Sequence, residues 1–141
     1  MRGRERLSEL LVPWCTYTDP EIAHVGLYVR EAQERSIDVR TITIPMTDVH
    51  RARIDGSAVG FLKVHLAGTS DRILGATIVG TNASEVVSEF TLAIAEGIGL
   101  VRLGRISRVY PTYSAAILQA ASAYGRAPGR GSRKGAPHRR R

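Results

Sequence analysis

Two neighbouring segments joined by a short turn constrain the fold of this chain most. Residues 60–66 (GFLKVHL) alternate apolar and polar side chains, the period of two that a strand with one buried face requires, and 72–79 (RILGATIV) supply a second apolar run. The turn from Gly68 to Asp71 between them predicts a β-hairpin. Residues 38–46 (DVRTITIPM) alternate in the same way, and Pro45 places the end of that strand at a sheet edge. The centre is therefore predicted to be three antiparallel strands.

The pattern becomes helical after residue 80. Apolar residues recur at three- and four-residue spacing from Ala83 to Ala95, with Asn82 or Ser84 as the candidate N-cap and glycine as the stop. A last helix is predicted over about 114–124, and its small apolar residues occupy most sides, which indicates that it packs against a partner surface.

The N-terminal part predicts shorter elements. Residues 12–18 (VPWCTYT) favour a strand that ends at Asp19-Pro20, the apolar stretch 22–27 follows, and 30–35 are good helix formers. Together the segments predict an α+β fold, an antiparallel sheet with helices packed on one face.

Composition limits the function classes. A chain of 141 residues with 43% hydrophobic and 23% charged residues fits one water-soluble domain. No apolar run approaches the roughly 18 residues of a membrane span, and no signal-peptide pattern follows the charged N-terminus, so a cytoplasmic location is expected. The single cysteine, Cys15, excludes an internal disulfide framework and a Cys-x-x-Cys redox pair.

The net charge of +7 lies entirely after Gly125, because residues 126–141 hold seven basic residues and no acidic one. This Gly-, Pro- and Arg-rich stretch is predicted to be a disordered tail. It is either a solvated terminus or a scar of gene truncation, or an arm that binds nucleic acid or another anionic surface. The neutral remainder favours the first interpretation, and nucleic acid is not the expected partner.

Recognisable cofactor and metal motifs are missing. Neither a G-x-G-x-x-G nor a G-x-x-x-x-G-K-[ST] fingerprint occurs, and the histidines lack the spacing of metal ligands, so no metal site is predicted. His24 and His65 are interpreted as strand residues with ordinary hydrogen bonds. A charged loop could bind an anion, but a solvated connection with local ion pairs is the favoured interpretation; it contains Asp48, Arg51, Arg53 and Asp55.

The remaining candidate is the turn Tyr110-Pro111-Thr112-Tyr113, which directly precedes the last apolar helix. A proline-fixed turn is a way to present a reactive tyrosine hydroxyl. The alternative is that both tyrosines are partly buried and that their hydroxyls form structural hydrogen bonds.

Residues 12–124 contain, in order, a set of short motifs that resembles the C-terminal dimerisation domain of the flavin-dependent pyridine nucleotide-disulfide oxidoreductases. The motifs are Val12-Pro13-Trp14-x-Thr16-Tyr17-Thr18-Asp19-Pro20-Glu21-x-Ala23-x-Val25-Gly26, Arg51-Ala52, Gly60-Phe61-x-Lys63, Ile73-Leu74-Gly75, Gly80-x-x-Ala83-x-Glu85-Val86 and Tyr110-Pro111-Thr112. The tyrosine before Pro-Thr resembles the mercuric reductase-like branch, because dihydrolipoyl dehydrogenases and glutathione reductases have histidine there.

The resemblance implies a two-fold interface at which a His-Pro turn reaches the flavin and the redox disulfide of the partner subunit. In that family the histidine is a general acid/base, oriented by a glutamate five residues on. Tyr110 occupies the histidine position and Ala115 the glutamate position, so Tyr110 is the candidate catalytic residue, and Tyr110 and Pro111 are the candidate flavin contacts. The cysteine pair of mercuric reductases is missing, and Tyr28 replaces a helix-capping threonine.

The residues and the resemblance are compatible with three functions. The first is a dimerisation module, with residues 1–10 as a lead, 11–125 as the domain and 126–141 as the tail. FAD and NAD(P) are the cofactors of the resembled family, but none is expected to bind this chain alone, so it is not expected to be catalytic alone. The second is a component of an oxidoreductase assembled in trans with a flavoprotein chain, and the third is a small anion- or nucleic-acid-binding protein. A homodimer or missing flavoprotein domains are the expected partners.

Overall fold

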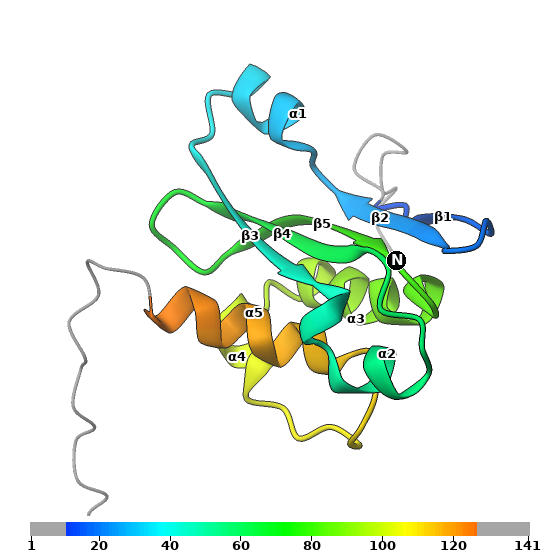
Figure 1. Ribbon diagram of the computed structural model, residues 1–141. Coiled ribbons are helices and arrows are strands. Elements are labelled where there is room, and N and C mark those ends of the chain that lie inside the picture. Colours follow the sequence, from blue (N-terminus) through cyan, green and yellow to red (C-terminus); the bar gives the residue numbers. More distant parts are fainter. Residues whose placement is uncertain (1–10, 127–141) are drawn as a thin grey trace, which may run out of the picture.

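The structure, a computed structural model, describes residues 11–126 (Figure 1). Five strands in this part of the chain form one antiparallel sheet with the order β1-β2-β5-β4-β3. The strands are β1 (Trp14–Thr16), β2 (Ile22–Gly26), β3 (Val39–Pro45), β4 (Phe61–Ala67) and β5 (Ile73–Val79). The helices are α1 (Val29–Glu34), the 3₁₀ turn η2 (Met46–Asp48), α2 (His50–Ile54), α3 (Ala83–Ala95), α4 (Leu100–Gly104) and α5 (Ala115–Arg126).

The predicted α+β fold is confirmed, and so is the hairpin of β4 and β5 with β3 at the edge of the sheet. The central sheet is larger than the three predicted strands. Residues 22–26 pair with β5 over their whole length, and β1 adds to their other side. Because Gly26 interrupts the apolar run, the strand character of this segment is weak in the sequence. The strand predicted over 12–18 is shorter and covers only Trp14–Thr16.

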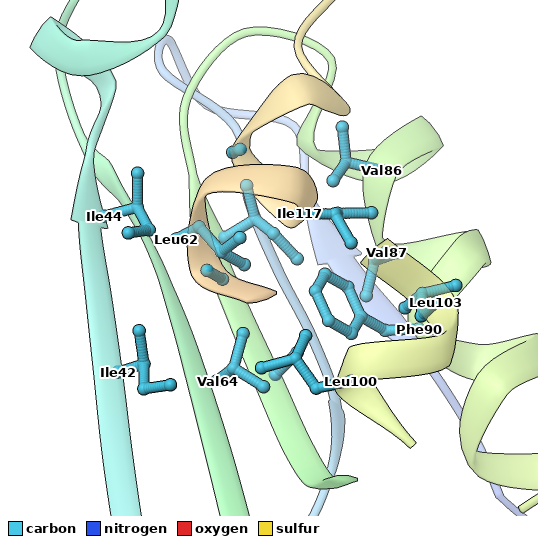
Figure 2. Packing of buried hydrophobic residues seen from close by; sticks show 14 of the residues in the cluster. Ile42, Ile44, Leu62, Val64, Val86, Val87, Phe90, Leu100, Leu103 and Ile117 are labelled. Atoms are coloured by element: carbon cyan, nitrogen blue, oxygen red, sulfur yellow. The ribbon is translucent and has the colours of Figure 1, made fainter. Parts of the chain in front are cut away.

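The core lies between one face of the sheet and the helices α3, α4 and α5. The register places Ile42, Val64, Ala76 and Val25 in one row across the sheet and Ile44, Leu62, Ile78 and Ala23 in the next. Figure 2 shows the sheet residues turned toward Phe90 of α3, Leu100 of α4 and Ile117 of α5. The alternation in the sequence therefore reports the buried face correctly.

Two short helices and the turn η2 are not predicted by the sequence pattern. The stretch 47–59 is polar overall, yet Val49 and Ala52 are fully buried and fix α2 against the core. Residues 100–104 form α4 through the buried Leu100 and Leu103. A helix of five residues shows little more than one period, so its apolar spacing carries too little signal for recognition.

The opposite face of the sheet carries two buried histidines, which are strand residues with ordinary hydrogen bonds, as predicted. His24 lies on β2, where Nδ1 contacts the Thr77 hydroxyl at 2.8 Å and Nε2 contacts the Gly26 carbonyl oxygen at 3.0 Å. His65 lies on β4, with Nδ1 2.9 Å from the hydroxyl of Thr41. Burial lowers the pKa of both imidazoles below the usual value.

The structure does not cover the two predicted end segments in full. The predicted lead, residues 1–10, and residues 127–141 of the predicted tail lie outside the described residues, and Arg126 is the last residue of α5 rather than part of a tail. Within residues 11–126, no helix has the length and apolar character needed to cross a membrane.

Candidate functional site

The turn around Tyr110 presents its side chain outward. Tyr110 is 68% exposed, and the next peptide bond, Tyr110-Pro111, is cis. The hydroxyl of Thr112 donates to the Val109 carbonyl oxygen at 3.0 Å and lies 3.1 Å from the Ser114 hydroxyl, which closes the turn onto the start of α5. Proline and these internal hydrogen bonds hold the tyrosine in a defined direction, because few backbone rotations remain.

The hydroxyl of Tyr110 meets a histidine from another part of the chain. It is hydrogen-bonded to Nδ1 of His50, the first residue of α2, and the two ring centroids are 5.7 Å apart. The two residues are 60 positions apart in the sequence. The structure therefore gives the candidate residue Tyr110 a partner that the sequence did not predict.

Tyr113 behaves differently from Tyr110. Only 5% of it is exposed, and its hydroxyl donates to Oδ2 of Asp55 at 2.9 Å. The prediction of a buried tyrosine with a structural hydrogen bond therefore holds for Tyr113. Tyr110 is also hydrogen-bonded through its hydroxyl, but the residue is largely exposed.

Asp55 also accepts a hydrogen bond from Nε of Arg51 at 2.8 Å, and the two residues are four positions apart in the sequence. The hydrogen bond from Arg51, followed by that from Tyr113, lowers the pKa of this carboxyl, and the same contact raises the pKa of Arg51. These residues form a local ion pair, as the favoured interpretation of the charged loop requires.

An open cleft of about 360 Å³ adjoins the Tyr110 turn. Its lining is net acidic, because it holds the carboxylates of Asp55, Glu85 and Glu89 and one guanidinium, that of Arg51. Arg51 is paired with Asp55, and Arg108 donates to Glu89 at 2.7 Å. The lining comes from α2, from α3 with the residue before it, and from the turn; it consists of Arg51, Asp55, Asn82, Glu85, Val86, Glu89, Pro111, Thr112, Tyr113 and Ser114.

The described residues do not fit a pyrophosphate-bearing cofactor such as FAD or NAD(P). A long helix binds phosphate at its N-terminus through free backbone N–H groups. In α3 that place is taken by a carboxylate, since the backbone N–H and the hydroxyl of Ser84 both donate to Oε2 of Glu21 at 2.9 Å. The acidic cleft beside α3 would also repel phosphate. Within residues 11–126, no group of three or more His, Cys, Asp or Glu side chains could hold a metal ion.

Three other sequence predictions concern single residues. Asn82 is the N-cap residue of α3, one of the two predicted candidates, but its side chain makes no capping hydrogen bond; instead the backbone N–H of Ser84 donates to Oε2 of Glu21. Ala115 is the first residue of α5 and provides no carboxylate to the turn. Tyr28 is the N-cap of α1, where its N–H donates to Glu31 at 2.8 Å and its ring stacks on His24 at a centroid distance of 3.7 Å.

Sequence reasoning missed the two contacts that shape the site most, His50 with Tyr110 and Glu21 with Ser84. Both join segments about 60 residues apart, so no local spacing signals them. The only signal available is that each is a polar residue beside a predicted element boundary.

Comparisons with known proteins cover most of the described residues. Residues 12–121 match the family model described as pyridine nucleotide-disulphide oxidoreductase, dimerisation domain. A dihydrolipoyl dehydrogenase of Buchnera aphidicola is 35% identical over 114 residues, which are 81% of this chain and 24% of the relative. A mercuric reductase of Staphylococcus aureus is 33% identical over 96 residues, or 68% of this chain and 18% of the relative.

Solved structures show the same fold. The HOCl-induced flavoprotein disulfide reductase RclA from Escherichia coli superposes with a TM-score of 0.75 at 23% identity, over 79% of this chain and 26% of RclA. LpdA from Mycobacterium tuberculosis gives a TM-score of 0.73 at 29% identity, over 79% of this chain and 24% of LpdA. The chain spans about a quarter of the length of the relatives it matches. By its motifs, its sheet and these matches, the chain belongs to the dimerisation domains of the pyridine nucleotide-disulphide oxidoreductases.

Proposed function

We propose that this chain forms the two-fold interface of an FAD-dependent NAD(P)H disulfide oxidoreductase by binding a second copy of itself. The observation that carries the proposal is the concentration of exposed apolar side chains in the segment that contains the candidate site. Val109 is 81% exposed, and large apolar side chains of the same segment are also exposed, namely Ile106, Tyr110 and Leu118. Exposed apolar surface of this kind marks a protein interface.

The arrangement of the segment suits an interface. It runs from the end of α4 through the Tyr110 turn into α5, and Figure 1 shows it beside α2, at the end of the molecule away from α1. The inner side of α5 is used by the core, because Ala116, Ile117 and Ala120 are buried there. Leu118 lies on the outer side and is 51% exposed. A second copy would cover this outer side together with the turn.

The redox cofactors belong to the complete oxidoreductase in this proposal, and the chain is not catalytic alone. Residues 11–125 act as the interface domain, and FAD and NAD(P) are held by domains outside it. Tyr110 and Pro111 then contact the flavin of the partner subunit, with Tyr110 as the catalytic candidate. The tyrosine before Pro-Thr supports the mercuric reductase-like branch, and a cytoplasmic location is part of the same proposal.

The proposal is tested by the mass of the purified 141-residue chain in sedimentation equilibrium. We expect a colourless homodimer. Leu118→Glu should weaken association by at least about 30-fold, since loss of an interface anchor costs about 2 kcal/mol. Leu92→Glu is the matched control, because Leu92 is a leucine on α3 that is 61% exposed, and it should leave association unchanged.

Two results would contradict the proposed homodimer. One is a chain that stays monomeric at every accessible concentration, and the other is an equal loss of association in the Leu118 and Leu92 variants. A yellow complex that absorbs near 450 nm would indicate a flavoprotein chain bound in trans, since the flavin carries the colour and the redox chemistry.

A further inference from the structure

We propose that His50 is the proton-accepting partner of Tyr110, so that the chain presents a phenol–imidazole pair at its interface. This inference rests on the proposed function only for the identity of the group that meets the pair. The contact itself is a property of one copy of the chain, because both residues belong to the same protomer.

The proposal requires that the phenol donates in this contact. A phenol has one O–H to donate, and Nδ1 of a neutral imidazole accepts it only when the ring hydrogen is on Nε2. The hydrogen bond between the Tyr110 hydroxyl and Nδ1 of His50 therefore selects that tautomer when both groups are neutral and the phenol donates. Tyr110 remains 68% exposed, so a group that docks on this face can reach it.

The segment that carries His50 is held to the Tyr110 side of the molecule by contacts on both sides of the histidine. Nε2 of Gln119 on α5 donates to the carbonyl oxygen of Asp48 at 2.8 Å, and the hydroxyl of Tyr113 donates to Asp55. Val49, the residue before His50, is fully buried. The backbone of His50 is thus fixed before the imidazole makes its contact, and the pair loses little further conformational freedom when it forms.

Charged neighbours do not take the place of His50. Nε of Arg51 on α2 donates to the carboxylate of Asp55, the residue after α2. The hydroxyl of Tyr113 donates to the same carboxylate. Ala115, at the start of α5, provides no carboxylate. Among the described contacts, His50 is thus the proton acceptor that the structure places on the Tyr110 hydroxyl.

The pair can do what a phenol alone does poorly at neutral pH. Phenols ordinarily ionise near pH 10, whereas imidazoles exchange protons near pH 6.5. When an acidic group such as a thiol docks on Tyr110, its proton moves to the phenol oxygen while the phenol proton moves to Nδ1 of His50. The products are a thiolate and an imidazolium, and the phenol stays neutral. His50 acts through Tyr110 and is a positioning and proton-accepting residue.

Acetylation of the isolated chain by N-acetylimidazole tests the pair without a flavin. The acetyl group passes to the phenol oxygen, and imidazole leaves with the phenol proton. With His50 as the base, Tyr110 should react faster than Tyr17, which is 78% exposed. His50→Gln keeps a hydrogen-bond acceptor but cannot take a proton, so it should slow Tyr110 at least tenfold, a modest fraction of what a general base contributes.

The reaction is followed at each tyrosine by peptide mass spectrometry, at protein concentrations where sedimentation shows a monomer. An unchanged Tyr110 rate in His50→Gln would overturn the proposal. Histidine ring ¹⁵N spectra of the wild-type chain give a second measurement that needs no variant. A hydrogen on Nδ1 of His50 at alkaline pH would overturn the pair, and a hydrogen on Nε2 would support it.

The two proposals fail separately. A chain that never dimerises but whose Tyr110 depends on His50 would contradict the interface and keep the pair. A dimer in which Tyr110 reacts independently of His50 would keep the interface and overturn the pair.

Discussion

At the scale of the residue, His24 of β2 uses both ring nitrogens: Nδ1 contacts Thr77 on β5, and Nε2 contacts Gly26 on its own strand. The carbonyl oxygen of Gly26 only accepts, so Nε2 carries the hydrogen and Nδ1 accepts from Thr77. Protonation of Nδ1 would remove that acceptor inside a buried site. The lowered pKa of His24, caused first by burial, therefore makes the folded chain prefer the neutral ring.

Acid should consequently destabilise the fold. The unfolded chain binds protons at the ordinary imidazole pKa near 6.5, and the folded chain binds them only at lower pH. The stabilisation by neutral His24 is thus fully present above pH 6.5 and is lost as the pH falls toward the lowered pKa, by at most about 1.4 kcal/mol per pH unit.

Urea unfolding between pH 7.5 and 5 measures this effect. His24→Asn should flatten the slope of unfolding free energy against pH, with a remaining slope from His65, whose pKa is lowered in the same direction. The range stays above the titration of Asp55, whose lowered pKa affects stability only in stronger acid. An unchanged slope in the variant would contradict the assignment to His24.

At the scale of the element, the crossing of α4 and α5 depends on a missing side chain. A Cβ atom at Gly104 would lie 2.2 Å from Cβ of Ala121 on α5. Gly104→Ala should therefore destabilise the fold by about 1–3 kcal/mol, because overpacking moves the two helices apart.

A double-mutant cycle with Ala121→Gly separates this contact from other effects of alanine. The second substitution removes the clashing methyl group, so it should recover much of the free energy of unfolding lost in Gly104→Ala. Equal destabilisation with and without Ala121→Gly would show that the close approach is not the cause. Thermal or urea unfolding of the four chains gives the comparison.

Elements with enough residues to show a period were predictable from the sequence. The alternation in 38–46 and 60–66 and the helical spacing of 83–95 all correspond to observed elements. The carboxylate contact at the start of α3 was not predictable, because Glu21, the residue before β2, lies 63 positions before Ser84 in the sequence. For the same reason the Tyr110 turn was predicted but its partner was not. Long-range polar contacts form only when the folded sheet brings distant segments together, so the local sequence pattern does not predict them.

At the scale of the whole molecule, Tyr124 joins the end of α5 to the sheet. Tyr124 of α5 is fully buried, its hydroxyl donates to the Thr69 carbonyl oxygen at 3.0 Å, and the guanidinium of Arg40 lies 4.9 Å from its ring centroid. These contacts join α5 to the β4–β5 turn and to β3. The C-terminal part of α5 is thus fixed to the sheet.

Deletion of residues 127–141 removes six of the seven basic residues that follow Gly125. Any salt-sensitive binding of nucleic acid should disappear with this deletion, because phosphate binding requires cations. A DNA-binding titration of the two chains checks this expectation, and DNA binding that survives the deletion would contradict it.

The contact between His50 and Tyr110 also has an evolutionary consequence. Each residue is exposed and contributes little to the core, so either could drift if it acted alone. Because the two residues share one hydrogen bond, loss of the imidazole in a descendant of this chain would relax selection on the phenol 60 positions away. The two residues should therefore be kept or replaced together. Covariation between these positions would be the historical trace of one hydrogen bond.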